Sequence, residues 1–193
     1  MRETLADLLG FPEERDLAGQ MVLAYGEIEF KLMVLMGHAL SSNTDLAAKV
    51  LYRVRGESAR IDVADALIRP AYYRVGLGPK WENCFGAIKK CKRFRNQYAH
   101  CHWFNFNSKL ALIDFDADVR SANDDVTLQQ LEVDVDLLQL QAEYFAYTLD
   151  FLSHLEGEYE RRTGLTTSNT MPEPKSLTPP PPYTKSTKPV STE

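Results

Sequence analysis

The feature that most constrains the fold is an apolar stripe near the start of the chain that repeats every three or four residues. Its members are Leu17, Met21, Ala24, Ile28, Leu32, Leu35 and Ala39. This spacing places them on one face of an α-helix, and Pro12 followed by two glutamates is a favourable helix start. The pattern predicts a helix from about residue 12 to residue 40.

Further helices are expected along the rest of the chain. Capping signals and apolar spacing predict two short helices, one on each side of Gly56, with Pro70 kinking or stopping the second. Another helix is expected from about Lys80 to residue 100. A long last helix, capped by Asp134 or Asp136, is expected to complete the set.

Between these last two helices the apolar pattern changes to a period of two. Large apolar residues alternate with other residues at Phe104, Phe106, Leu110 and Leu112. The Asn107-Ser108 pair offers a turn between them, so a small two-stranded hairpin is expected, followed by either a short third strand or an extended link in residues 126–133. Aspartates at 114, 116 and 118 are interpreted as a solvated strand edge. The predicted fold class is therefore mainly all-α: a helical bundle with a small β-hairpin between the fourth and last long helices.

The chain is expected to comprise a helical domain at 1–163 and a disordered tail at 164–193. After residue 163 the apolar content falls, and proline, serine, threonine and lysine dominate. The four consecutive prolines 179–182 favour polyproline II, and a docking motif for a partner is the alternative to an unfolded tail. Three cysteines without pair spacing, with no membrane span or signal pattern, indicate a soluble cytoplasmic protein.

Charge is distributed unevenly along this acidic chain, whose formal net charge is −5. Residues 49–95 contain 12 Lys or Arg and 4 Asp or Glu, whereas residues 96–160 contain 2 basic and 13 acidic residues. A local positive potential can attract phosphate despite a negative total. Basic and acidic helices that face each other within the fold would explain the same asymmetry, so charge alone leaves both interpretations open.

The end of the cationic segment carries the best candidate for chemistry. Arg95 falls seven residues after Ile88, at a position of the packing stripe where an apolar residue is due. Asn96 and His100 are one turn apart and share a helix face. Arginine supplies a fixed fork of donors for phosphate, and histidine can exchange a proton near neutrality. The competing interpretation is a helix end in which Arg95 pairs with Glu27 or Glu29.

The sequence Arg-Asn-x-x-Ala-His at a helix end, followed by a Trp-containing strand and a long helix, resembles the HEPN superfamily (higher eukaryotes and prokaryotes nucleotide-binding domains). The resemblance covers about residues 13–162, and only the short motif is specific. It implies a homodimer that acts as a metal-independent endoribonuclease on RNA, as toxins or antiviral effectors do, under the control of an antitoxin or other regulatory protein. Some members only bind nucleotides or proteins, so a catalytically silent module that binds RNA, a nucleotide or a protein partner is the alternative.

The resemblance also implies a role for each residue of the motif. Arg95 would hold the scissile phosphate, His100 would move the proton, and Asn96 would orient one of them. The basic side chains expected to draw in RNA are Lys89, Lys90, Lys92 and Arg93. Glu27 or Glu29 would support Arg95, and His102 occupies the place where some toxins of the superfamily have a tyrosine. No metal or other cofactor is predicted, because His100, Cys101 and His102 point to different faces and lack zinc-ligand spacing.

Overall fold

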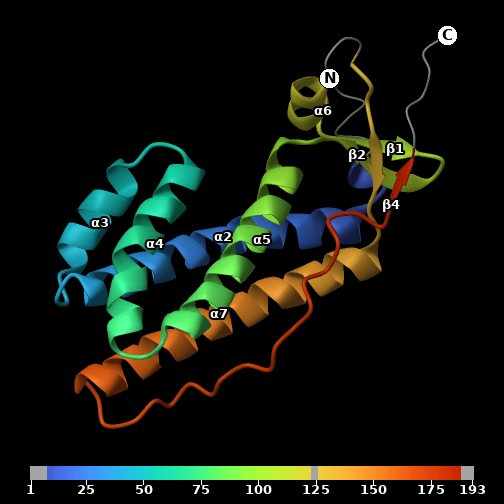
Figure 1. The fold of residues 1–193 in the computed structure, drawn as a ribbon. Coiled ribbons are helices and arrows are strands. Elements are labelled where there is room, and N and C mark those ends of the chain that lie inside the picture. The colour runs from blue at the N-terminus through green and yellow to red at the C-terminus, as the bar shows by residue number, and fades with distance from the viewer. Residues whose placement is uncertain (1–7, 123–125, 188–193) are drawn as a thin grey trace. The chain divides into compact units, whose positions relative to one another are not determined.

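The computed structural model describes residues 8–122 and 126–187, and it divides into two compact units. Unit 1 comprises residues 1–23, 91–144 and 178–193, and unit 2 comprises residues 24–90 and 145–177. The prediction of a mainly helical chain with a small antiparallel sheet is confirmed (Figure 1). Three long helices, α2 (Pro12–Ala39), α5 (Gly78–His100) and α7 (Val135–Thr163), contribute residues to both units.

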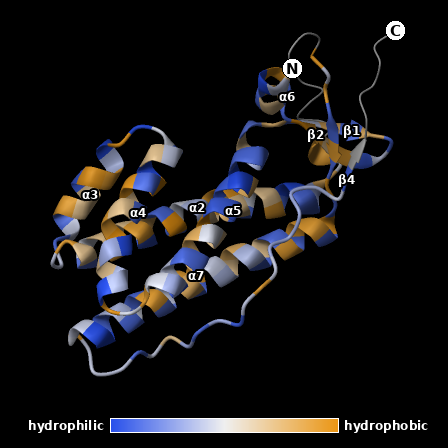
Figure 2. Cartoon of the chain, viewed as in Figure 1, coloured by the Kyte–Doolittle hydropathy of each residue, from blue (hydrophilic) through white to orange (hydrophobic). Residues whose placement is uncertain are grey.

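Unit 2 is built from helices around an apolar core. Besides parts of the three long helices, it contains α3 (Thr44–Arg53) and α4 (Glu57–Arg74). Asn43 caps α3 by accepting a hydrogen bond from the Leu46 backbone N–H at 2.9 Å. The largest fully buried side chains of the unit include Ile28, Leu35, Leu51, Ile68, Tyr72 and Trp81. The hydropathy view shows the corresponding mixture of apolar and polar faces on each helix (Figure 2).

Pro70 lies inside α4, so the expectation that it could stop this helix is wrong. α4 continues to Arg74 with Pro70 on its exposed side. Ala71 and Tyr72 beyond the proline are buried. Their packing therefore outweighs the free-energy cost of the helical hydrogen bond that proline cannot donate. The turn after α4 passes through Gly76, whose φ of +73° suits glycine, and α5 begins at Gly78 rather than Lys80.

Unit 1 contains a small antiparallel sheet with strand order β1-β2-β3-β4. The expected hairpin is present as β1 (His102–Phe106) and β2 (Lys109–Ile113), and β3 (Gln130–Glu132) pairs with β2. Asn107 and Ser108 form the turn, with φ of 52° and 61°. Two successive positive φ values match the twist of a two-residue hairpin.

The three aspartates after β2 form a helix start, and the interpretation of a strand edge is wrong. α6 (Phe115–Ser121) begins here, and Asp114 Oδ1 accepts a hydrogen bond from the Ala117 N–H at 3.0 Å. Asp118 is buried, and its Oδ2 accepts the Gln129 N–H at 2.9 Å. Aspartates spaced two residues apart fit a helix start, because acidic side chains are favoured both at the N-cap and in the first turn of a helix.

The C-terminal segment is anchored where a disordered tail is expected from sequence. In unit 2, Asn169 Nδ2 donates to the His154 carbonyl at 3.0 Å, and Lys80 forms an ion pair with Glu173 at 2.6 Å. In unit 1, β4 (Lys185–Thr187) pairs with β3 and extends the sheet, as the red end of the ribbon in Figure 1 shows. Low apolar content predicts little core packing, but it does not exclude hydrogen bonds to a preformed surface.

Candidate functional site

The last turns of α5 carry the Arg-Asn-x-x-Ala-His motif in unit 1. His100 is the last residue of the helix and is exposed, whereas Arg95 and Asn96 are half-buried. Arg95 Nη1 donates a hydrogen bond to Asn96 Oδ1 at 3.1 Å. The two neighbours are therefore linked at the side-chain level, and the guanidinium is oriented by the amide.

Asn96 and His100 open into a cavity of about 560 Å³. The residues that line it also include Arg93, Gln97, Asp114, Asp116, Asp118, Gln129 and Tyr183. The structure thus brings together Arg93, Asn96 and His100 from the predicted set, which share one helix face. Arg95 is not among the described lining residues and is connected to the cavity through Asn96.

The acidic side of this cavity is a feature that sequence reasoning missed. Each of its three carboxylates has a partner: Asp114 and Asp118 accept the backbone N–H groups given above, and Asp116 Oδ1 lies 2.9 Å from Arg120 Nε. These contacts offset part of the negative charge that would otherwise oppose a phosphate. Its signal in the sequence is the alternation of aspartates, whose period of two also fits a strand.

Basic side chains precede the motif along α5. Lys89, Lys90 and Arg93 are exposed, and Lys92 is half-buried. Residues 89, 93, 96 and 100 are separated by four, three and four positions, so they follow one face of the helix. Lys89 also lies over the Phe85 ring, with Nζ 4.4 Å from the ring centroid. Within unit 1, the exposed cation on the helix face of Asn96 and His100 is Arg93, whereas Lys89 and Lys90 belong to unit 2.

The residues expected to support Arg95 have other surroundings. Glu29 Oε1 accepts a hydrogen bond from Arg60 Nη1 at 2.6 Å, and Glu27 is exposed. The structure therefore gives Glu29 a different partner from the one expected. His102 opens β1, is exposed, and stacks its ring against Phe104 with the planes 19° apart.

A buried polar network lies beneath the motif. Tyr98 Oη donates to Gln141 Oε1, and Trp103 Nε1 donates to the Tyr98 carbonyl at 3.1 Å. Burial raises the pKa of Tyr98 well above its usual range. Gln141 is fully buried, which no local pattern indicates, because a single glutamine in an amphipathic helix normally faces solvent. The network connects α5 to α7 within unit 1.

Cys101 follows directly after His100 and is partly buried. Burial, with smaller contributions from Asp114 and Asp118, raises the pKa of its thiol to about 12. The thiolate is the reactive form of cysteine, so a raised pKa reduces the reactive fraction of this thiol at neutral pH. Cys84 and Cys91 are fully buried.

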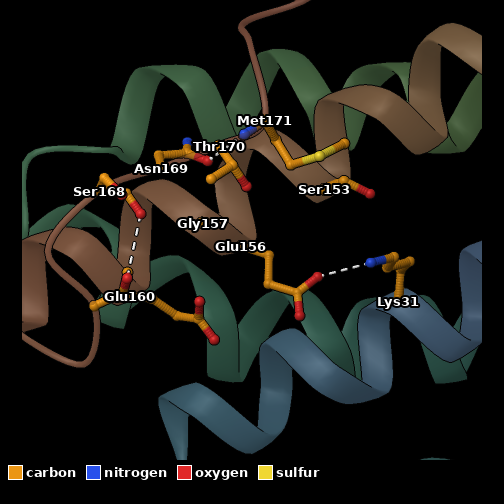
Figure 3. A pocket seen from close by; sticks show the side chains of 10 residues that line it. Lys31, Ser153, Glu156, Gly157, Glu160, Ser168, Asn169, Thr170 and Met171 are labelled. Atoms are coloured by element: carbon orange, nitrogen blue, oxygen red, sulfur yellow. Dashed lines mark hydrogen bonds and ion pairs between the residues drawn. The ribbon is translucent and has the colours of Figure 1, made fainter.

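One group of described residues in unit 2 has the composition of a metal site. Ligand atoms of His38, Glu156 and Glu160 all lie within 4.8 Å of one another. Figure 3 shows the two glutamates at a cavity, with a dashed line between Glu156 and Lys31. The cavity has a volume of about 350 Å³, and Lys31 Nζ lies 2.8 Å from Glu156 Oε2. The ammonium group already neutralises Glu156, so a cation would have to displace it. Local sequence patterns do not reveal this cluster, because His38 comes from α2 and the two glutamates come from α7.

Comparison with known proteins provides no relative for this chain. No protein-family model matches it, and neither the curated proteins nor the solved structures contain a significant match. Within the described ranges, the structure contains no helix that is both long and apolar enough to span a lipid bilayer.

Proposed function

We propose that the protein is a metal-independent endoribonuclease of the HEPN type, as the resemblance of the Arg95–His100 motif implies. One observation supports this most: Asn96 and the exposed His100 meet at an open cavity, with Arg95 hydrogen-bonded to Asn96. An imidazole accessible to solvent, beside a guanidinium oriented by an amide, provides the groups needed to act on a phosphodiester.

The chemistry requires two proton transfers and one displacement at phosphorus. His100 would take the proton of a ribose 2′-hydroxyl, and the 2′-oxygen would attack the adjacent phosphorus. The bond from phosphorus to the 5′-oxygen breaks, and that oxygen receives a proton from a second acid, which a second copy of His100 would supply. Arg95 would stabilise the charge that develops on the phosphoryl oxygens. The products would be a 2′,3′-cyclic phosphate and a free 5′-hydroxyl.

An apolar hollow beside the motif supports the homodimer that this scheme needs. About 500 Å³ in volume, the hollow is lined by Val22 and Leu23 of α2 and by Tyr98, Ala99 and Trp103 near the motif. The Leu23 side chain is 78% exposed. A second copy of the chain would bury this surface and bring another His100 close to the first. The cationic face of α5 would hold the RNA backbone, with binding that weakens as salt rises.

The acidic wall of the cavity favours a second candidate function. Three carboxylates near His100 oppose a polyanion, even with their partners in place. A catalytically silent module that binds RNA, a nucleotide or a protein partner would need no turnover at His100. This candidate and the nuclease differ in one observable, which is cleavage.

The test is incubation of wild-type protein with labelled single-stranded RNA in EDTA, together with Arg95→Ala and His100→Ala. Arg55→Ala is the matched control, because Arg55 is exposed and lies outside the motif. The nuclease predicts cleavage by wild type and control only, with 2′,3′-cyclic ends. Binding without cleavage by any protein would establish the silent module, and equal cleavage by all four would indicate a contaminant.

A further inference from the structure

The C-terminal segment is attached to unit 1 by two buried glutamines. Gln97 Nε2 donates to the Pro182 carbonyl at 2.7 Å, and Gln141 Nε2 donates to the Pro181 carbonyl at 2.6 Å. The relative exposures of Gln97 and Gln141 are only 9% and 0%. A buried amide donor without an acceptor is costly, so the consecutive proline carbonyls satisfy a requirement of the folded unit.

Thr184 continues this attachment onto the sheet. Its N–H donates to the Glu132 carbonyl at 2.8 Å, and its Oγ1 donates to Asp134 Oδ2 at 2.9 Å. β4 then pairs antiparallel with β3, with Lys185 opposite Glu132. An extended peptide that adds a strand to an exposed sheet edge is a known mode of peptide recognition. Here the peptide belongs to the chain itself.

Tyr183 lies between the two anchored residues Pro182 and Thr184. It lines the same cavity as Asn96 and His100. His100 remains exposed while the segment is in place, so the segment forms a wall of the cavity and does not cover the imidazole. An aromatic ring fixed at the side of a cavity is suited to stack on an unpaired nucleobase.

We propose that residues 181–187 are a built-in part of the site, and that Tyr183 is the residue that stacks on a base of single-stranded RNA held beside His100. The docking of the segment stands on the hydrogen bonds alone, whereas the stacking role rests on the proposed function. The proposal therefore gives residues 181–187 a function, although their composition indicates only a tail.

The experiment uses full-length variants and two measurements. Thr184→Pro removes the N–H that binds Glu132, and Thr178→Pro makes the same change at an exposed position for which the described residues show no hydrogen bond. Tyr183→Ala removes the ring, and Tyr183→Phe retains it. Hydrogen–deuterium exchange of residues 183–187 reports docking, and fluorescence anisotropy with a short single-stranded RNA reports binding.

Docking predicts slow exchange in wild type and Thr178→Pro, and exchange at least tenfold faster in Thr184→Pro. Stacking predicts an RNA affinity about tenfold weaker in both Tyr183→Ala and Thr184→Pro, with Tyr183→Phe within about twofold of wild type. Exchange that is fast in wild type would overturn the docking. Equal affinity of Tyr183→Ala and wild type, or tighter binding by Thr184→Pro, would overturn the stacking role. Wild-type protein that binds no RNA would overturn the proposed function and the stacking together, and exchange would still decide the docking.

Discussion

The guanidinium of Arg95 and the amide of Asn96 are joined by a hydrogen bond of 3.1 Å from Nη1 to Oδ1. Successive residues of a helix project about 100° apart, so the long arginine side chain must turn along the helix surface to make this contact. The contact holds the guanidinium beside Asn96, which lines the cavity. Asn96 is therefore expected to act by positioning Arg95.

Asn96→Ala tests this positioning role. Loss of the amide releases the guanidinium from one orientation, and we expect RNA cleavage about tenfold slower in single-turnover assays, with RNA affinity changed less than twofold. Asn83→Ala, an exposed asparagine of the same helix, is the control and should cleave at the wild-type rate. An equal loss of affinity and rate would show that Asn96 contacts the RNA directly.

Tyr98→Phe is expected to destabilise the protein by about 1–2 kcal/mol. The substitution leaves the buried Gln141 Oε1 without the hydroxyl that donates to it. Urea denaturation measures the change as a lower midpoint. Tyr52→Phe, at a side chain that is 52% exposed, should leave the midpoint nearly unchanged. Equal midpoints for the two variants would mean that the hydroxyl of Tyr98 contributes nothing net to stability.

The Cys101 thiol should react slowly despite its partial exposure. Because its pKa is raised to about 12, almost no thiolate is present at pH 8. We expect alkylation by iodoacetamide at pH 8 to be at least tenfold slower in the folded protein than in urea, measured on the Cys101 peptide by mass spectrometry. Labelling at the rate of the unfolded chain would show that the thiol is not shielded as the structure indicates.

Low pH should reduce the stability of the folded protein through protonation of Glu158. Its hydrogen bond from Arg161, helped by one from Asn169, lowers the pKa of this carboxyl to about 2. A carboxyl with a depressed folded-state pKa stabilises fully above its unfolded value near 4.5, and this contribution is lost as pH falls toward 2. The urea midpoint of Glu158→Gln should therefore lie below that of wild type at pH 5, with a gap that narrows toward pH 2.

The control for this acid effect is Glu143→Gln, at an exposed position of α7. Its midpoint should follow that of wild type across the whole pH range. A gap between Glu158→Gln and wild type that stays constant with pH would contradict the depressed pKa.

Gly157→Ala should loosen the unit 2 part of the C-terminal segment. Alanine normally stabilises a helix relative to glycine, but a methyl group here would meet the Asn169 side chain, which packs directly over Gly157. Hydrogen exchange of residues 165–175 is expected to accelerate several-fold. Gly86→Ala has open space around the new methyl, so it should leave this exchange unchanged and raise the urea midpoint. Unchanged exchange in Gly157→Ala would show that Asn169 can move aside at no cost.

The parts of the fold that could be predicted are those that local rules determine. The apolar stripe of α2 and the Asn107-Ser108 turn each specify one backbone geometry, and both expectations match the structure. The prediction that Pro70 could stop its helix is wrong, because the tertiary packing of Tyr72 opposes the helix-breaking tendency of proline. α6 was missed because a period of two in a short segment fits a strand and a capped helix start equally well.

In the candidate site too, local sequence rules predict some features and tertiary packing determines the others. Asn96 and His100 meet as their helical spacing predicts, whereas Tyr183 reaches them across more than 80 residues of sequence. A contact of that separation depends on the tertiary fold, and no local pattern around Tyr183 encodes it. Glu29 had a choice of arginines, and only the folded structure shows that Arg60 is its partner.

The hydrogen bonds that hold residues 181–187 do not require the segment to belong to the same copy of the chain. Gln97, Gln141 and β3 would form the same hydrogen bonds with this segment if a second copy of the chain supplied it. Two forms can be compared: one in which the segment binds its own molecule, and one in which it binds a second molecule. The first is favoured while the effective concentration of the tethered segment exceeds the concentration of the protein in solution. An exchange of this kind would place Tyr183 of one molecule in the cavity of the next.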